Sequence, residues 1–175
     1  MTVHFYRLDP EEARAARPAL PSHLQIRCWQ PERDGFPPGS LQLSNYLWWA
    51  LARGSAFANR GFTEIRIEED GRLLHRLIVT PGWYRFPFMS ERDLQIGQVW
   101  TDPGARRRSL ARVAIAEAHH RFAGERRRFW YVTRADNRAS QALAESCGYQ
   151  LVASGRRTRR LGLALLGQYV IEQSV

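Results

Sequence analysis

The chain has 175 residues, a formal net charge of +9 and 44% hydrophobic residues. This length fits one domain, and the apolar fraction can build a core, which excludes a mainly disordered chain. No apolar run approaches the roughly 20 residues that span a bilayer, so we expect no membrane association. Met1 to Pro10 show no secretion-signal pattern, and the two cysteines offer neither a disulfide framework nor zinc ligands. We therefore expect a cytoplasmic protein.

The positive charge comes entirely from arginine, because all 26 basic residues are Arg and none is Lys. The planar guanidinium group suits phosphate and carboxylate groups. A strongly basic surface is typical of proteins with an anionic partner: a nucleic acid, a phosphorylated cofactor, a nucleotide-linked substrate or an acidic membrane. Composition alone does not choose among these four.

The N-terminal region is expected to lie outside the domain. Pro10, Pro18 and Pro21 stand among charged and small residues, which predicts an irregular extension over residues 1–22. A single domain is then expected over residues 23–175, because no internal repeat or low-complexity tract divides that stretch.

Within this domain, apolar residues at intervals of two or in short runs predict strands, and apolar residues at helical spacing predict helices. The strands are expected at 23–29, 62–69, 72–80, 94–101, 128–133, 149–155 and 163–172. The helices are expected at 41–57, 105–122 and 137–147. Asp70-Gly71, between the second and third strands, is a strong hairpin signal. Helices alternate with strands in the second half, which predicts crossover connections and a mixed sheet in an α/β (α+β) protein.

The turn between the strand at 94–101 and the helix that follows is the first candidate site. A strand that leads directly into a helix leaves the first helical amides without partners, and these amides attract anions. Arg106, Arg107 and Arg108 stand in this turn. The turn is therefore expected to hold a pyrophosphate, and a solvated basic turn is the structural alternative.

The second candidate segment is the start of the helix at 137–147. Asn137 is a good N-cap residue, and Ser140 falls on the first turn of this helix. Taken alone, these residues indicate only a well-capped helix that ends at Gly148.

Together and in this order, the two segments resemble the GNAT acyltransferase (N-acetyltransferase) superfamily. The phosphate turn of that family reads roughly V-x-P-x-x-R-G-x-G-[LIA], and residues 101–110 match it. The later segment of the family reads N-x-x-[SA]-x-x-L-Y-x-x-x-G-F, and residues 137–149 match it. The predicted strand order is also similar to the core of the family. The resemblance covers about residues 23–172 and implies a GNAT-like mixed, mostly antiparallel central sheet flanked by helices.

The resemblance implies acetyl-CoA as the acyl-donor co-substrate. Backbone groups of Val99 and Thr101 would bond its pantetheine arm as an added strand does. Asn137 and Ser140 would lie along the arm near the thioester. The residues whose amides would cradle the pyrophosphate are Arg106, Arg107, Arg108, Ser109, Leu110 and Ala111.

The sequence departs from the family pattern at four positions. Arg107 and Ser109 replace two glycines of the phosphate turn, where glycine allows a close backbone approach to the ligand. The family often has a glutamate base at the position of Gln98 and a tyrosine acid at the position of Ala144. Neither Gln98 nor Ala144 transfers a proton near pH 7.

Three explanations of the missing proton acceptor stay open. Another residue serves as the base, and the candidates are His75, Glu91 and Asp93, although His75 on a strand is more typical of a structural residue. Alternatively, the acceptor amine has a low pKa and needs little help. In the third case the protein binds acyl-CoA without much catalysis.

The resulting prediction is an enzyme that transfers an acetyl group directly to a primary amine. The stretch over residues 86–101 is similar to acetyltransferases of bacterial surface-polysaccharide pathways, which indicates an amino sugar, either free or nucleotide-linked, as the small-molecule acceptor. A non-catalytic acyl-CoA-binding protein is the first alternative. A basic nucleic-acid-binding module is the second, but no motif of such modules is present, so we expect no specific nucleic-acid partner.

Two further expectations concern side chains outside these motifs. The loop at 81–91 carries too many aromatic residues for a solvated loop, and it is expected to cover the acceptor pocket or to form the contact of a homodimer. His119 and His120, late on the helix at 105–122, are expected to face solvent.

Overall fold

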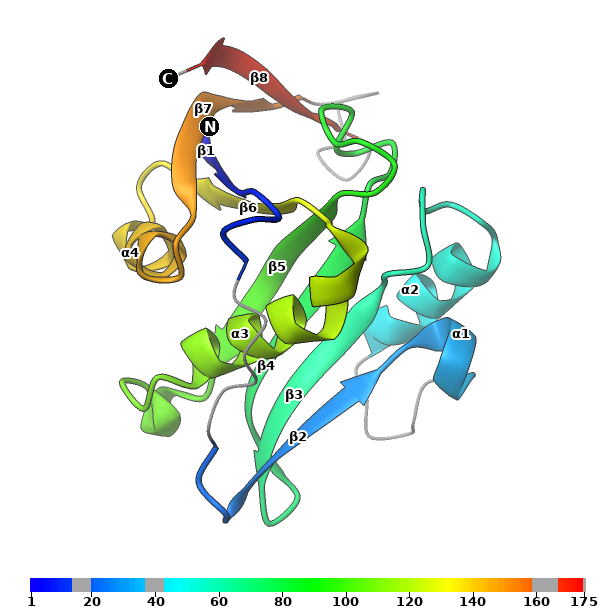
Figure 1. Cartoon of the computed structure of the whole chain (residues 1–175), viewed down its shortest axis with the longest axis vertical. Helices are drawn as coiled ribbons and strands as arrows, with labels where there is room; N and C mark the ends of the chain where they lie inside the picture. Colours follow the sequence, from blue (N-terminus) through cyan, green and yellow to red (C-terminus); the bar gives the residue numbers. More distant parts are fainter. Residues whose placement is uncertain (14–19, 37–42, 159–166, 175) are drawn as a thin grey trace.

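The computed structural model describes residues 1–13, 20–36, 43–158 and 167–174. Its eight strands form one sheet in the order β2-β3-β4-β5-β6-β1-β7-β8 (Figure 1). The strands are β1 (Thr2–Leu8), β2 (Leu24–Trp29), β3 (Thr63–Glu69), β4 (Arg72–Pro81), β5 (Leu94–Thr101), β6 (Phe129–Arg134), β7 (Gln150–Arg157) and β8 (Tyr169–Ser174). β5 and β6 run parallel, whereas the other neighbouring strands pair antiparallel. This arrangement confirms the predicted mixed, mostly antiparallel sheet.

Helices lie on both faces of this sheet. They are α1 (Pro31–Asp34), α2 (Leu43–Arg53), α3 (Leu110–Phe122) and α4 (Arg138–Ser146), with short 3₁₀ turns η1 (Pro103–Ala105) and η2 (Ala123–Glu125). Helix α3 crosses β3, β4 and β5 on one face, and α4 lies beside β6 and β7 (Figure 1). Among the described residues, none of these helices is long and apolar enough to cross a membrane.

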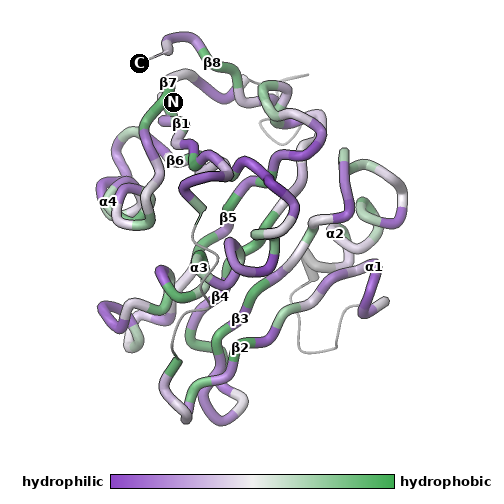
Figure 2. The backbone as a smooth tube through the Cα atoms, viewed as in Figure 1, coloured by the Kyte–Doolittle hydropathy of each residue, from purple (hydrophilic) through white to green (hydrophobic). Residues whose placement is uncertain are grey.

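The main core lies between α3 and the sheet. Ala114 and Ile115 of α3 pack with Ile65, Ile67 and Leu77, and all five side chains are buried. Alternate residues of β3 and β4 therefore face α3, and Figure 2 shows hydrophobic stretches along these strands. The residues between them face the opposite side of the sheet, because successive side chains of a strand point to opposite faces.

Aromatic residues of α2 cover part of that opposite face. Trp48 and Trp49 pack against a second cluster that contains Trp29, Phe62 and Ile78. The large rings explain how an 11-residue helix is fixed to the sheet, since each buried aromatic side chain removes a large apolar area from water.

The predicted hairpin between β3 and β4 is confirmed. Asp70 has φ 48° and Gly71 has φ 80°. Both central residues of a type I′ turn need positive φ, which is why Asp-Gly is favoured there.

The N-terminal residues differ from the prediction. Thr2–Leu8 form β1 between β6 and β7 inside the sheet, so this part of the expected extension over 1–22 belongs to the domain. Register shifts between Phe5 and Tyr6, and both side chains are buried. This bulge interrupts the alternation that would mark a strand in the sequence.

Three smaller boundaries also differ. Residues 31–34, where no helix or strand was predicted, form the one-turn helix α1. The expected helix at 105–122 begins only at Leu110, because η1 and a turn occupy the preceding residues. The expected last strand corresponds to β8, and residues 163–166 of the expected strand lie outside the described part of the chain. Residues 41–42 of the expected helix before β3 also lie outside it.

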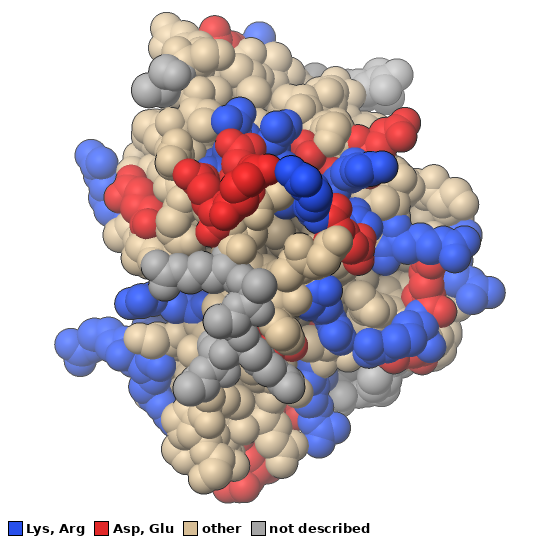
Figure 3. Space-filling view, viewed as in Figure 1, with Lys and Arg blue, Asp and Glu red and all other residues tan. Residues whose placement is uncertain are grey.

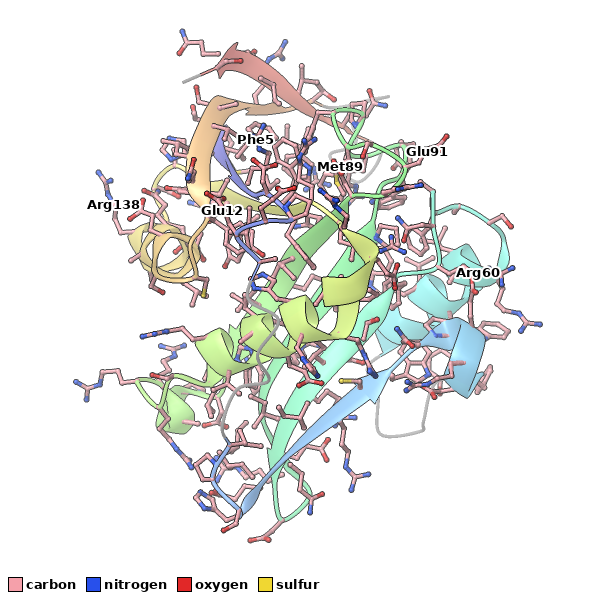
Figure 4. All side chains as sticks on the ribbon, in the orientation of Figure 1. Phe5, Glu12, Arg60, Met89, Glu91 and Arg138 are labelled. Carbon is pink, nitrogen blue, oxygen red and sulfur yellow. The ribbon has the colours of Figure 1, made fainter. Side chains whose placement is uncertain are left out.

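The aromatic loop between β4 and β5 packs within the molecule. Phe88 contacts Phe5 and Trp130 with ring centroids 4.9 Å apart in each pair. Phe86 stacks on Tyr169 of β8, and Met89 packs on the same cluster, close to Phe5 in Figure 4. These rings join the loop to β1, β6 and β8 and belong to the core, while the expected pocket cover or dimer contact of this loop stays a prediction.

Candidate functional site

A cleft opens where β5 and β6 separate. The two strands pair only over Leu94–Ile96 and Phe129–Tyr131, and a cavity of about 280 Å³ lies beyond that point. The cavity is lined by Met1, Val3, Ile96, Gly97, Gln98, Val99, Tyr131, Val132, Thr133, Arg134, Asn137, Ser140 and Tyr169. Four of the residues that the sequence analysis associated with the site therefore lie together here: Gln98, Val99, Asn137 and Ser140.

Strand β5 presents a free edge to this cleft. From Gly97 onward its described backbone pairs only with β4 on its other side. An exposed strand edge offers backbone amides and carbonyls to any extended chain that lies alongside it. The position of Val99 and Thr101 on this edge fits the expectation that they bond a pantetheine arm.

A bulge lies in the same stretch of β5. Arg76 pairs with Trp100 and Ile78 pairs with Gly97, so Gln98 and Val99 together oppose the single residue Leu77. Gln98 has φ 50°, a left-handed conformation. A bulge leaves one residue outside the ladder, and its backbone amide is free to bond a ligand.

The basic turn lies between β5 and α3. The Asp102 carboxylate accepts a hydrogen bond from the Gly104 amide at 2.8 Å and forms an ion pair with Arg72 at 3.1 Å. The Arg72 guanidinium holds the pKa of Asp102 below its usual range. The side chain of Ser109 does not cap α3, so the first amides of the helix face the turn. Figure 3 shows arginine side chains gathered near this end of α3, and Arg106 and Arg107 are exposed.

The start of α4 closes the cleft from the other side. The Asn137 side chain accepts a hydrogen bond from the Ser140 amide at 3.1 Å, which confirms the predicted cap. Both residues line the cavity. Arg138 points away from the molecule at the same helix end (Figure 4).

Tyr131 is a cleft residue that the sequence analysis missed. This residue of β6 is among those that line the cavity, and its side chain is hydrogen-bonded to Ser140. Burial raises the pKa of the Tyr131 hydroxyl, and the bond from Ser140 partly opposes this effect. Tyr131 is therefore protonated at neutral pH. It sits in an apolar strand, whose pattern indicates only core.

The three candidate bases do not lie in the cleft. His75 is fully buried on the α3 side of β4, with Nδ1 2.8 Å from the Thr101 hydroxyl, and burial lowers its pKa to about 4. Glu91 is exposed in the aromatic loop. Asp93 is buried, and its carboxylate accepts hydrogen bonds from Ser90 and Trp130. Their assignment as bases stays a prediction that this placement does not support.

The two adjacent histidines of α3 differ in environment. His120 is exposed, as expected. His119 is buried, which contradicts the expectation that it faces solvent, and its Nε2 lies 2.9 Å from the Tyr149 hydroxyl. Burial lowers the pKa of His119 to about 4. Its position one helical turn after Ile115 puts it on the apolar stripe.

Comparison with a family model assigns the chain to a known class of protein. The model of the Acetyltransferase (GNAT) family matches residues 22–149. This match covers more than half of the chain, and the protein therefore belongs to the GNAT acetyltransferase family. Enzymes of this family use acetyl-CoA as acyl donor.

Solved structures share the fold. A tandem GNAT protein from the clavulanic acid biosynthesis pathway has a TM-score of 0.62 and 15% identity, with 86% of this chain and 50% of that chain covered. A Drosophila protein has a TM-score of 0.59 and 23% identity, and the match covers 87% of this chain and 48% of that chain. AAC(6')-Iy, solved with the bisubstrate analogue CoA-S-monomethyl-acetylneamine, has a TM-score of 0.52 and 15% identity. That match covers 74% of this chain and 92% of that chain.

The lengths of these proteins differ from that of the present chain. The chain spans about half the length of the first two structures. A comparison with curated proteins finds no match.

Proposed function

We propose that this protein transfers the acetyl group of acetyl-CoA directly to a primary amine, and that the acceptor is a small amino sugar. The observation that carries the proposal is the cleft between β5 and β6. It combines a free strand edge, a bulge at Gln98 and a basic helix entrance within one connected stretch, residues 96–110. The thioester, the pantetheine arm and the pyrophosphate would use the bulge, the strand edge and the helix entrance, respectively.

The donor would lie along this stretch. Its pantetheine arm would pair with the β5 edge at Val99 and Thr101, and its pyrophosphate would rest on the amides of the turn before α3. Guanidinium groups of Arg106 and Arg107 would neutralise part of the phosphate charge. The thioester would then stand near the bulge.

The reaction would proceed by direct attack. The neutral amine nitrogen bonds to the thioester carbonyl carbon, and the carbonyl oxygen becomes an oxyanion. The free backbone amide of the bulge at Gln98–Val99 would stabilise that charge. The carbon–sulfur bond then breaks, and CoA leaves as a thiolate.

Tyr131 would protonate the leaving thiolate. Tyr131 is one of the residues that line the cleft, and its hydroxyl stays protonated at neutral pH and is hydrogen-bonded to Ser140. The position of Ala144, where the family often has a tyrosine, is buried in α4. Tyr131 would therefore supply the acid from β6 instead, and it would recover its proton from the amine through water.

The absence of a carboxylate at Gln98 supports an acceptor of low basicity. An amine on a sugar ring is less basic than a lysine side chain, because nearby oxygens withdraw electron density. More of it is neutral at pH 7, and the need for a base falls.

Binding of the donor tests the first part of the proposal. Calorimetry should show that acetyl-CoA binds with at least tenfold higher affinity than acetyl-pantetheine, which lacks the pyrophosphate. The Arg126→Gln variant, altered in an exposed turn that contacts Glu11, should bind acetyl-CoA as the wild type does. No binding of acetyl-CoA at millimolar concentration would refute both the enzyme and the acyl-CoA-binding alternative.

A further inference from the structure

The cleft between β5 and β6 is lined from both faces of the sheet. Tyr131 lines the cleft and belongs to the core under α3. Val132 and Tyr169 also line it, and they pack on the cluster that contains Phe5 and Trp130. That cluster lies on the other face, because Trp130 precedes Tyr131 in β6 and successive side chains of a strand point to opposite faces. The proposed pyrophosphate site at the start of α3 uses the first face, which leaves the face with Tyr169 for the acceptor.

Tyr169 reaches the cleft from the far end of the sheet. It stands on β8, the last strand in the sheet order, and β7 and β1 lie between β8 and β6. This end of the sheet curls, so that β8 lies beside the loop that joins β4 to β5 (Figure 1). Tyr169 therefore borders the acceptor side of the cleft although its strand is not a neighbour of β5 or β6.

The loop between β4 and β5 holds Tyr169 in this position. The Tyr169 amide donates a hydrogen bond to the Arg85 carbonyl at 2.9 Å. The side-chain amide of Gln168, the preceding residue, donates to the Tyr84 carbonyl at 2.7 Å. The ring of Phe86 stacks on the Tyr169 ring with a centroid distance of 5.3 Å and an angle of 15°. A side chain held in this way loses little conformational entropy when it binds a ligand.

The hydroxyl is the part of the Tyr169 side chain that stays available. Phe86 and the Arg157 guanidinium, 5.5 Å from the ring centroid, already contact the ring. Within the described part of the chain, the Tyr169 hydroxyl has no hydrogen-bond partner, whereas the hydroxyl of Tyr131 is bonded to Ser140. Tyr169 is half-buried. A few polar groups among apolar side chains set the orientation of a ligand in a pocket, and this hydroxyl suits that role.

We infer that the Tyr169 hydroxyl hydrogen-bonds a ring hydroxyl of the acetyl acceptor and thereby orients the acceptor amine toward the thioester. This inference rests on the proposed acetyltransferase function and adds an acceptor-binding residue to it. A phenol hydroxyl both donates and accepts hydrogen bonds, as a sugar hydroxyl does. A site that bonds a substrate hydroxyl discriminates against the analogue that lacks it. Tyr169 is thus expected to select hydroxylated cyclic amines over aliphatic ones.

The test compares two cyclic amines on two proteins. Glucosamine carries ring hydroxyls and cyclohexylamine carries none. Release of CoA thiol gives kcat/KM for each, calculated for the neutral amine so that differences in amine pKa cancel. We expect the wild type to favour glucosamine by about tenfold or more. Tyr169→Phe should lower this preference about fivefold, the loss of one neutral hydrogen bond, through a higher KM for glucosamine. Its affinity for acetyl-CoA, measured by calorimetry, should stay unchanged.

A change in the ratio separates a contact with the acceptor from a structural role. Tyr169→Phe keeps the ring and its stack on Phe86, so it should fold as the wild type does. Damage to the cleft would lower kcat/KM for both amines, whereas a lost contact with a hydroxyl lowers it for glucosamine alone. Tyr46→Phe is the matched control, because Tyr46 contacts Phe36 and is not among the described residues that line the cleft. It should keep the wild-type ratio.

The outcomes also separate this inference from the proposed function. The inference is overturned, and the acetyltransferase stays intact, if other amines are acetylated but glucosamine is not, if the ratio is unchanged in Tyr169→Phe, or if both amines lose equally. If no amine is acetylated, the proposed function fails. Calorimetry with CoA present then decides the inference. Glucosamine must bind the wild type more tightly than it binds Tyr169→Phe, and equal or absent binding overturns the inference as well.

Discussion

Arg107 and Ser109 both adopt left-handed backbone conformations in the turn before α3, with φ 62° and 58°. Residues with a Cβ adopt this conformation at a cost of about 1 kcal/mol each. Glycine, which the family pattern has at these two positions, adopts it freely. The backbone thus keeps the shape of a glycine turn although its residues are not glycine. The strain at Ser109, directly before the first amides of α3, leads to the first prediction.

Ser109→Gly should raise the free energy of unfolding by about 0.5–1 kcal/mol. It should also tighten acetyl-CoA binding, because removal of the Cβ lets the pyrophosphate approach the amides. Denaturant titration measures the first effect and calorimetry the second. The control is Ser55→Gly, since Ser55 has φ 55° in an exposed connection after α2. It should stabilise the fold similarly and leave acetyl-CoA affinity unchanged. Weaker acetyl-CoA binding by Ser109→Gly would refute this account of the turn.

Tyr131→Phe removes the proposed acid and keeps the ring. We expect kcat to fall about tenfold to hundredfold, a modest effect for acid catalysis because a thiolate leaves readily. The affinity for acetyl-CoA should change little. Tyr149→Phe is the matched control, because the Tyr149 hydroxyl contacts His119 in the core. It should lower stability by about 1 kcal/mol without changing kcat. An unaltered kcat for Tyr131→Phe would exclude its role as acid.

Buried histidines should make the fold sensitive to acid. Burial lowers the pKa of His75 and His119 to about 4, against about 6.5 in an unfolded chain. Between these pH values the unfolded state binds more protons than the folded state. The free energy of unfolding is therefore highest above pH 6.5 and falls as the pH drops toward 4. From pH 7 to pH 5 each histidine should cost about 2 kcal/mol.

Denaturant titrations at the two pH values measure this loss, and His119→Gln should remove about half of it. His120→Gln is the control, since His120 is exposed on the same helix. A pH dependence that stays unchanged in His119→Gln would show that this histidine is not the cause.

Much of the site was predictable because its signals are local. The bounds of β5 match the prediction, since its apolar pattern ends at Asp102-Pro103. The cap of α4 follows from Asn137 alone, because an N-cap bond joins residues three apart in sequence. The basic turn is likewise a short continuous segment.

The features that were missed depend on contacts between distant segments. The pairing of Arg27 with Arg66 cannot be seen in the sequence, because strand register decides which residues of β2 and β3 stand opposite each other. Tyr131 follows the same rule, since only the separation of β5 and β6 turns a core residue into a cleft residue. The strand β1 was missed because its bulge buries successive residues, Phe5 and Tyr6.

The central claim is that the cleft between β5 and β6 acetylates an amine of low basicity without a dedicated base. The most direct test is the pH dependence of amine-dependent CoA thiol release, measured with amines of different pKa. We predict that the rising limb of kcat/KM moves with the pKa of each amine, that amino sugars outperform lysine-like amines at pH 7, and that replacing His75, Glu91 or Asp93 leaves the limb in place. A limb with the same midpoint for every amine, abolished by one of these replacements, would contradict the account and identify the base.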